Sequence, residues 1–457
     1  MSVDVDRIIQ RAMDLSCGQD AMRDKVVARI YQEAESLANE VVLVEKPARD
    51  WDGWIDDVVT SRRLGYPSML ALLALVLWLT ISGANLPSQL LSHFLFEIEG
   101  GLSSLFFVLR APDWLHGLLV LGVYRCLAWV VSVMLPPMAI FFPLFTLLED
   151  LGYLPRVAFN LDGFFKKAGA HGKQALTMSM GFGCNAAGVI ACRIIESPRE
   201  RLIAILTNNF VPCNGRFPTL ITMSNIFLGT MAFAGGSAVL LVAGLVVGGI
   251  AVTLGVSWLL SRTLLTGIPS HFTLELPPYR PPQVVQVIVR SVVDRTLFVL
   301  WRAVKVAAPA GALAWLLANI HVNGLSLLNH TARFLQPLGA VMGLDGFILL
   351  AFILGLPANE IVIPIILMSY LSAGAMLELD SFPALRQLLL DHGWSWVTAL
   401  NMMLFSLLHF PCGTTLLTIH KETHSWKWTL LAALIPTIIG VAVCLLVAQG
   451  ARLVGLV

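Results

Sequence analysis

Long runs of apolar residues alternate with short charged stretches along most of the chain. Each of five runs contains the ~20 apolar residues that a helix needs to cross the ~30 Å hydrocarbon core of a bilayer. These runs lie at about 66–86, 115–148, 231–261, 296–318 and 428–450. The run at 115–148 exceeds that length, so we expect it to be kinked or tilted. The pattern predicts an all-α, polytopic helical membrane protein.

Four further apolar segments, at 175–195, 202–228, 346–372 and 396–419, are broken by glycine or proline. In a bilayer, non-helical backbone survives only where protein buries it or where it lines a water-filled cavity. Broken helices with polar side chains at membrane depth are typical of a translocation site. We therefore expect broken or re-entrant helices around such a site, with breaks near Gly183, Pro212 and Pro218, Pro357, and Pro411.

Charges beside the broken segments indicate the side from which each enters the membrane. Basic residues flank 175–195 at both ends, which predicts a hairpin entered from the cytoplasm. The loop 376–393, which follows 346–372, is acidic, so the second hairpin should enter from outside. Two halves of opposite orientation form an inverted-topology repeat, whose binding site is expected near the midplane between them.

Three connecting segments have distinct charge. The acidic loop 87–114 is expected outside, the basic linker 262–295 inside, and 319–345 is a polar stretch that contains histidines. The side on which the C-terminus lies depends on whether 346–372 crosses fully, which the sequence leaves open.

Residues 1–65 are polar and charged, so we expect no cleaved signal peptide and a cytoplasmic N-terminus. Amphipathic patterns at 3–17 and 22–44, the second closed by Pro47, predict a helical segment. A solvated leader and a docking platform explain this segment equally well. The transmembrane domain is then expected over 66–450.

Composition narrows the function. Only 13% of residues are charged, against roughly 25% in soluble domains, which supports the membrane assignment. The net charge of +1, with no long basic patch, argues against a nucleic-acid partner. The seven cysteines form no CxxC pair, so neither a disulfide framework nor a structural zinc site is indicated. The chain shows no P-loop, the nearest string being 169–174, and no hydrolase motif, so we expect a transporter rather than an enzyme.

Cys184, Cys213 and Cys412 each fall at an expected helix break. A break frees backbone carbonyls, and the C-terminal end of a half-helix carries partial negative charge that suits a cation. Thiolates together with carbonyls favour a borderline divalent transition metal over Mg²⁺ or Ca²⁺. The alternative is that these cysteines are ordinary buried residues, which is the interpretation we adopt for Cys126, Cys192 and Cys444.

Glu360 is the most costly residue in the chain, because an acidic group at the bilayer centre costs about 2.5–3.5 kcal/mol. It is expected to face the cavity as a metal ligand, a proton carrier or a partner of Arg216, unless it forms a structural ion pair. Asn185 offers a neutral oxygen or a helix cap, as do Asn209, Asn214 and Asn359. His409 is either a ligand or an interior histidine. The methionines Met178, Met180, Met402 and Met403 are interpreted as packing rather than as a metal path.

Several motifs resemble the membrane part of the ferrous iron transporter B (FeoB) family. The matching runs are 147–159, Gly183-Cys184-Asn185 with Arg193, 212–218, Phe410-Pro411-Cys412 and the stretches 421–423 and 425–428. The resemblance covers roughly 50–450. It implies two Gate repeats, at about 175–261 and 346–450, and Fe²⁺ uptake across a bacterial inner membrane. It also implies that Cys184, Cys213 and Cys412 line the ion path, with Fe²⁺ as transported substrate and no permanently bound cofactor.

The chain departs from the family pattern in three places. The GTPase domain with which FeoB proteins usually begin is not found, so GTP hydrolysis, if used, is expected on a separate polypeptide. Asn359-Glu360 stands where the family tends to have Lys-Glu, and Ala186-Ala187-Gly188 replaces Val-Pro-Ala. Alternatives are a carrier for another divalent metal or a nucleoside-like solute, or a receptor or scaffold for a separate GTPase. The energy source, metal selectivity and homo-oligomer formation stay undetermined.

Overall fold

The computed structural model describes residues 29–37, 40, 51–61, 63–228, 236–267, 283–376 and 382–455. Contacts divide the chain into two units, Met1–Asp56 and Asp57–Val457. In the first unit, residues 29–37 are helical and exposed, as expected within 22–44. The expected helix at 3–17 and Pro47 lie outside the described residues. The short helix α2 (Trp51–Val59) spans the division.

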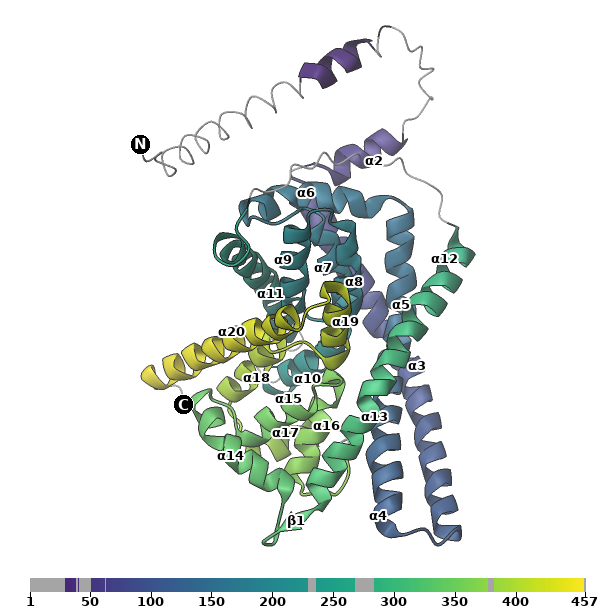
Figure 1. Ribbon diagram of the computed structural model, residues 1–457, viewed down its shortest axis with the longest axis vertical. Coiled ribbons are helices and arrows are strands. Elements are labelled where there is room, and N and C mark those ends of the chain that lie inside the picture. The colour runs from purple at the N-terminus through teal and green to yellow at the C-terminus, as the bar shows by residue number, and fades with distance from the viewer. Residues whose placement is uncertain are drawn as a thin grey trace, which may run out of the picture. The chain divides into compact units, whose positions relative to one another are not determined.

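The second unit is a bundle of helices, and six of those described are long and apolar enough to cross a membrane. Figure 1 shows their arrangement. Its first part comprises α3 (Gly65–Val108), α4 (Asp113–His116), the π-helix η1 (Gly117–Tyr124) and α5 (Arg125–Asp150). Helix α5 packs along α3 and continues through Pro136 and Pro137. These observations confirm the all-α membrane fold.

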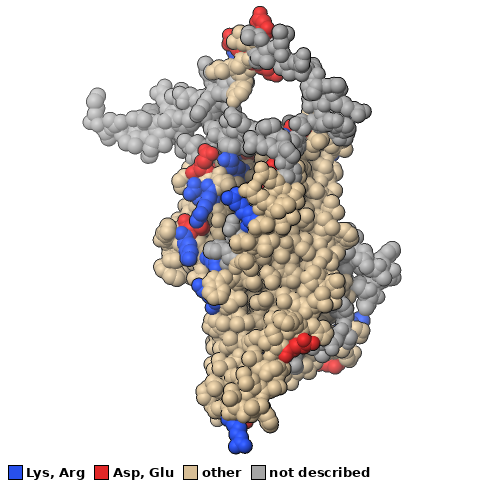
Figure 2. Space-filling view, turned by 90° about the vertical axis from the view of Figure 1, so that its right-hand side faces the viewer, with Lys and Arg blue, Asp and Glu red and all other residues tan. Residues whose placement is uncertain are grey.

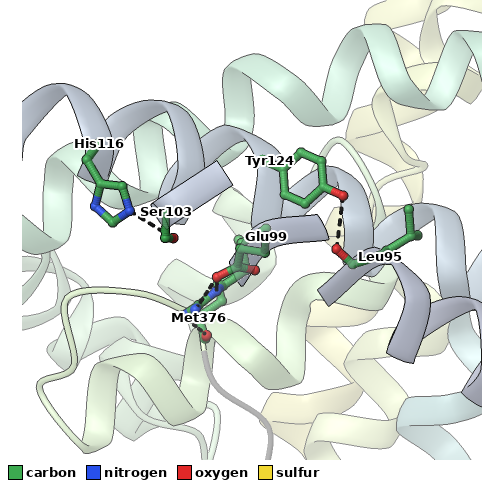
Figure 3. A network of polar contacts seen from close by, with 7 residues as sticks. Leu95, Glu99, Ser103, His116, Tyr124 and Met376 are labelled. Atoms are coloured by element: carbon green, nitrogen blue, oxygen red, sulfur yellow. Dashed lines mark hydrogen bonds and ion pairs between the residues drawn. The ribbon is translucent and has the colours of Figure 1, made fainter. Parts of the chain in front are cut away.

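The prediction of an external loop at 87–114 is wrong, because α3 runs through Pro87 to Val108. Of the three acidic residues that suggested a loop, Glu97 and Glu99 lie on α3 and Asp113 begins α4. Glu99 is buried and accepts hydrogen bonds from Arg125 of α5, at 2.9 Å for Nε. Arg125 NH1 also donates to the carbonyl of Met376 at 3.3 Å, so one side chain ties α3 and α5 to the loop after α16. Figure 3 shows this network.

The second part of the unit is built from two similar series of elements. The first repeat runs from α6 to α11: α6 (Tyr153–Lys167), α7 (Gln174–Gly183), α8 (Asn185–Ala191), η2 (Cys192–Ile194), α9 (Pro198–Thr207), η3 (Asn208–Phe210), η4 (Asn214–Arg216), α10 (Phe217–Leu228) and α11 (Gly236–Arg262). A linking section follows: α12 (Val284–Arg290), η5 (Ser291–Leu297), α13 (Phe298–Asn319) and the paired strands β1 (His321–Val322) and β2 (Leu325–Ser326).

The second repeat runs from α14 to α20: α14 (Leu327–Val341), α15 (Gly346–Leu354), η6 (Asn359–Ile361), α16 (Val362–Tyr370), α17 (Phe382–Asp391), α18 (Trp396–Leu408), α19 (Gly413–Thr423) and α20 (Trp426–Leu453). Apart from the inserted α17, it follows the order of the first repeat. Each has an amphipathic helix, a broken hairpin, a second broken segment and a long final helix. Across the repeats, α10 packs on α18 and α8 on α19.

Both expected hairpins are present. Lys173, just before α7, lies beside the end of η2, its Nζ being 3.2 Å from the carbonyl of Ile194. Asp345, just before α15, accepts a hydrogen bond from the hydroxyl of Tyr370 at the end of α16. The start and the end of each broken segment therefore lie together. Figure 1 shows α7 and α8 towards one end of this unit and α15 and α16 towards the other, as an inverted repeat requires.

Two local predictions need correction, at Pro218 and in 376–393, and the polar stretch 319–345 has structure that the sequence left open. Pro218 does not break a helix, because it occupies the first turn of α10, where a missing N–H costs no hydrogen bond. The stretch 319–345 is a short strand pair followed by α14, a helix capped by Ser326. The acidic loop 376–393 contains α17. In the last two cases polar residues belong to amphipathic or short helices rather than to loops.

One side chain joins the repeats at their centre. Arg216 is fully buried and its NH1 donates to the carbonyls of Asn209 at 2.7 Å and Leu407 at 2.9 Å. Its Nη2 donates to the side-chain oxygen of Asn209 at 3.1 Å. The same nitrogen donates to the carbonyls of His409 and Phe410, each at 3.4 Å. These carbonyls have no partner within a helix, because η3 and α18 end there. Arg216 therefore satisfies the broken backbone of both repeats.

We expect Gly346→Ala to destabilise the fold by about 3 kcal/mol. Gly346 begins α15, at the bend of 112° between α14 and α15. A Cβ at Gly346 would overlap the backbone carbonyl of Ala332, which cannot rotate away. Thermal unfolding of the purified protein measures the effect. Gly244→Ala in α11, where nothing lies within 4 Å, is the control and should be neutral or slightly stabilising. Equal unfolding temperatures would contradict this packing.

Arg216→Leu should cost at least about 3 kcal/mol, because it leaves three or more buried carbonyls unsatisfied at about 1–3 kcal/mol each. The same unfolding measurement applies. Arg333→Leu on the exposed face of α14 is the matched control, with an expected change within about 0.5 kcal/mol. If the two variants unfold alike, the guanidinium does not hold the repeats together.

Candidate functional site

The helix breaks of both repeats meet at one small cavity of about 30 Å³. A space of this size holds about two water molecules, because each needs roughly 10–15 Å³ of it. The wall is formed by α5, α13 and the four breaks. The lining residues are Met134, Met138, Gly183, Cys184, Asn185, Cys213, Gly215, Val299, Ala303, Pro357, Ala358, Asn359, Glu360, Cys412 and Thr414.

All three cysteines singled out at helix breaks line this cavity. Each has extended backbone and immediately precedes a new helical turn: Cys184 before α8, Cys213 before η4 and Cys412 before α19. Cys184 has φ −154° and ψ 124°, and Ala358, at the equivalent place in the second repeat, has φ −153° and ψ 121°. The inverted repeat is therefore reproduced in the backbone of the site itself.

The other three described cysteines of the membrane unit are packing residues. Cys126, Cys192 and Cys444 are fully buried, and their sulfur atoms lie 3.3–3.4 Å from backbone carbonyls within helical contacts. None of them lines the cavity. Position at a helix break thus separates the two groups of cysteines.

Glu360 is the one charged side chain in the cavity wall and is 9% exposed. Its backbone carbonyl accepts a hydrogen bond from the indole of Trp129 at 3.3 Å. Its carboxylate lies against Gly215, where any Cβ would overlap it, so glycine is needed for this approach. No ion pair between Glu360 and Arg216 occurs among the described residues. The guanidinium of Arg216 donates hydrogen bonds to carbonyls instead.

The asparagines divide into two roles. Asn185 and Asn359 occupy equivalent positions in the two repeats, and both line the cavity. Asn208 and Asn209 support the break behind them. Asn208 donates to the carbonyl of Asn185 at 3.1 Å, and Asn209 donates to the carbonyl of His409 at 2.7 Å. Asn209 and Asn214 do not line the cavity.

His409 is fully buried and stands one layer behind the cavity wall. Its Nδ1 lies 2.9 Å from the carbonyls of Phe405 and Ser406, so this nitrogen is the donor. Its Nε2 is then an acceptor and lies 3.3 Å from the side-chain amide of Asn359, which donates to it when the amide nitrogen occupies this position. The contact places His409 as a support for Asn359 rather than as a lining group.

Sequence reasoning missed three parts of the site. Met134 and Met138 of α5 contribute thioethers to the wall, whereas the sequence analysis named other methionines. Their spacing of four around Pro136 places them on one helix face, which was a usable signal. Thr414 also lines the cavity, and Asn208 holds the first break. Nothing in the local sequence around Asn208 distinguished it from Asn209.

The donor groups are dispersed. Among the described residues, no three His, Cys, Asp or Glu side chains stand close enough together to hold a metal ion. The cavity instead combines three thiols, two thioethers, two amides and one carboxylate on a shared wall. Soft sulfur donors with one charged oxygen suit a weakly held, borderline divalent cation.

Family models match most of the membrane unit. The Gate model, described as "Nucleoside recognition", matches residues 131–227 and 300–426. The model of the ferrous iron transport protein B C terminus matches residues 242–294. The matched ranges contain all four helix breaks that meet at the cavity. No solved structure matches the chain.

Curated relatives extend the match to nearly the whole chain. The Fe(2+) transporter FeoB of Staphylococcus aureus strain COL is 28% identical over 93% of this chain, and that of Methanocaldococcus jannaschii is 26% identical over 92%. A Porphyromonas gingivalis fusion of Fe(2+) transport protein A with FeoB is 27% identical over 82%. The chain spans 64% of the length of the first of these relatives. Both family models and the curated relatives therefore agree that the chain is similar to the Gate-containing membrane part of FeoB proteins.

Proposed function

We infer that this chain carries Fe²⁺ across a bacterial inner membrane, through the cavity between the two repeats. The observation that carries the proposal is the convergence of Cys184, Cys213, Cys412 and Glu360 on one cavity at four helix breaks. The relatives named as Fe(2+) transporters support the choice of ion.

Each donor has a role in this proposal. The ion exchanges some of its water for the three thiols and the Met134 and Met138 thioethers, and Glu360 balances its charge. Asn185 and Asn359 offer neutral oxygens from equivalent positions, and His409 orients Asn359. A set of dispersed donors binds weakly enough to release the ion, which transport requires. Selection against Mg²⁺ and Ca²⁺ follows from the sulfur atoms, because those ions prefer oxygen ligands.

A nucleoside carrier is the second candidate, because the matching Gate model is described as "Nucleoside recognition". The cavity size argues against it. Organic ligands of drug size occupy pockets of roughly 300–1,000 Å³, about ten times the 30 Å³ present here. An ion with one retained water molecule fits this space far better.

Contacts between the repeats suggest how the cavity is closed from each side. At the basic end, Arg193 after α8 forms two 2.7 Å hydrogen bonds with Glu422 of α19. At the other end, Trp394 stacks on Phe227 of α10 and donates to Tyr370 at 2.7 Å. We infer that the two contacts open in alternation as the repeats move.

The distribution of charge supports the orientation. Figure 2 shows Lys and Arg side chains gathered towards one end of the membrane unit. Cytoplasmic segments carry an excess of Lys and Arg. We therefore assign this end, and the N-terminal segment before α3, to the cytoplasm. In this arrangement a separate GTP-binding polypeptide would act from the same side.

We expect Cys184→Ser, Cys213→Ser and Cys412→Ser each to lower Fe²⁺ flux at least about tenfold, which corresponds to ~1.4 kcal/mol of lost interaction. The measurement is uptake of Fe²⁺ down a gradient into proteoliposomes that contain the chain, under reducing conditions. Cys444→Ser is the matched control, because a serine there can still donate to the carbonyl of Asn401.

Retained flux in all three cysteine variants would sink the proposed ion path. No flux by the unmodified chain under any gradient would favour a receptor or scaffold for a separate GTPase. Flux of uridine or adenosine through the unmodified chain would favour the nucleoside carrier. The folding of each variant is checked by thermal unfolding before the flux is compared.

Glu360→Gln should also lower Fe²⁺ flux about tenfold or more, because it removes the one charge in the cavity wall while keeping the side-chain shape. Gly215→Ala should have a similar effect, since its Cβ displaces that carboxylate. Glu97→Gln on the exposed face of α3 is the control and should transport normally. Unchanged flux in Glu360→Gln would remove the carboxylate from the mechanism.

A further inference from the structure

A second, larger cavity of about 360 Å³ lies beneath the amphipathic helix α6. Its wall comes from α3, α5, α6, α7 and α11 and is almost entirely apolar. Only three of the twenty lining residues carry a hydroxyl: Tyr66, Tyr153 and Ser179. Buried water needs two to four polar partners, and apolar cavities of ~150 Å³ stay dry. Water is therefore a poor occupant, while the surrounding bilayer supplies apolar chains of matching character.

Basic side chains stand at the ends of the elements that form this wall. Arg63 lies three residues before Tyr66, and Lys166 and Lys167 directly follow the lining residue Phe165. All three basic residues are exposed. Lys166 is partly neutralised by Asp162 at 2.7 Å, whereas Arg63 and Lys167 form no ion pair within the described part of the chain. Basic pockets between membrane helices on the cytoplasmic side favour anionic lipid headgroups.

The hydroxyls in the wall differ in how they are bonded. Tyr66 donates to the carbonyl of Asn160 at 3.1 Å and Ser179 to that of Ala175 at 2.9 Å. The hydroxyl of Tyr153 is buried near Ser68, whose own hydroxyl donates to the carbonyl of Gly65, and forms no hydrogen bond of normal geometry among the described residues. A buried hydroxyl without a partner is costly. An ester or phosphate oxygen of a lipid would satisfy it.

We propose that this cavity binds one acyl chain of an anionic phospholipid, whose headgroup is held by Arg63, Lys166 and Lys167. The chain enters from the leaflet at the basic end of the membrane unit. Apolar burial holds the acyl chain, and the basic side chains select the headgroup. Two helices of its wall, α3 and α11, carry exposed apolar side chains such as Leu70 and Val247, as helices in contact with lipid do.

The cavity is connected to the ion site through packed aromatic rings. Phe145 lines the apolar cavity and stacks on Phe141 at 5.7 Å between ring centres. The Phe141 ring lies directly against Gly183, where a Cβ would overlap it. Gly183 precedes Cys184. Helix α7 gives a second link, because Met178 and Phe182 line the apolar cavity and the helix ends at Gly183. A bound acyl chain therefore stabilises the position of the first break.

Lipid binding is measured on the purified chain by native mass spectrometry, with phosphatidylglycerol and phosphatidylcholine of identical acyl chains. The unmodified chain should retain phosphatidylglycerol about fivefold better than phosphatidylcholine, the ratio expected for one basic side chain. Ser179→Phe fills part of the cavity and should lower retention of both lipids about tenfold, as loss of two buried methylene groups would. Lys166→Gln/Lys167→Gln, which leaves Arg63 in place, should reduce the preference for phosphatidylglycerol and leave the retention of phosphatidylcholine unchanged.

Ser104→Phe is the matched control, because Ser104 is an exposed helical serine with the same hydrogen bond to the carbonyl four residues earlier. It should retain lipid like the unmodified chain. Equal retention by Ser179→Phe would overturn the cavity as the binding site. Equal retention of the two lipids by the unmodified chain would overturn the anionic headgroup.

The effect on transport rests on the proposed function and is tested separately. Fe²⁺ flux through the unmodified chain should rise about fivefold when phosphatidylcholine liposomes are replaced by phosphatidylglycerol, and Ser179→Phe should lose this dependence while Ser104→Phe keeps it. The measurement of lipid retention needs no metal, so its result remains valid if the chain does not transport Fe²⁺. Flux that ignores lipid composition, with selective retention intact, would overturn the coupling alone.

Discussion

The structure depends on satisfying backbone carbonyls where helices break inside a bilayer. Exposed peptide groups at membrane depth cost several kcal/mol each, so a break persists only if protein groups bond to it. Arg216 makes four contacts to such carbonyls, which come from both repeats, and a fifth to the side-chain oxygen of Asn209. The same guanidinium therefore stabilises the breaks and holds the two inverted halves in register.

This use of Arg216 determines the electrostatics of the small cavity between the repeats. Because the two terminal nitrogens of Arg216 bond to carbonyls and to the side chain of Asn209, Glu360 has no ion pair with it and brings the only formal charge among the residues that line the cavity. Two glycines then permit the required close approaches: Gly215 to the Glu360 carboxylate and Gly183 to the Phe141 ring. The cavity is small because these contacts leave room for little more than an ion and a water molecule.

The two repeats share a backbone plan but differ in the side chains that close them. A charged pair, Arg193 with Glu422, joins them at the basic end, while aromatic stacking around Trp394 joins them at the other. Exposed ion pairs weaken with salt and contribute little to stability, whereas the aromatic contact relies on burial. The two ends therefore respond differently to their surroundings. Bound lipid beneath α6 would add a third influence, transmitted through Phe145 to the first break.

The sequence by itself determined the membrane fold, the inverted order of the broken segments and the positions of Cys184, Cys213 and Cys412, because long apolar runs and breaks by Gly and Pro are local properties. The prediction from sequence failed where a residue distant in the chain determines the local structure. Arg125 of α5, for example, donates to Glu99 and so allows this carboxylate to lie within a helix. Only the tertiary structure decided that Arg216 binds carbonyls rather than Glu360, and that His409 stands behind Asn359. The first outcome depends on groups that lie 191 residues apart in different repeats, and the second on two breaks that lie 50 residues apart within one repeat. Neither contact follows from a local pattern, because each depends on how the helices pack.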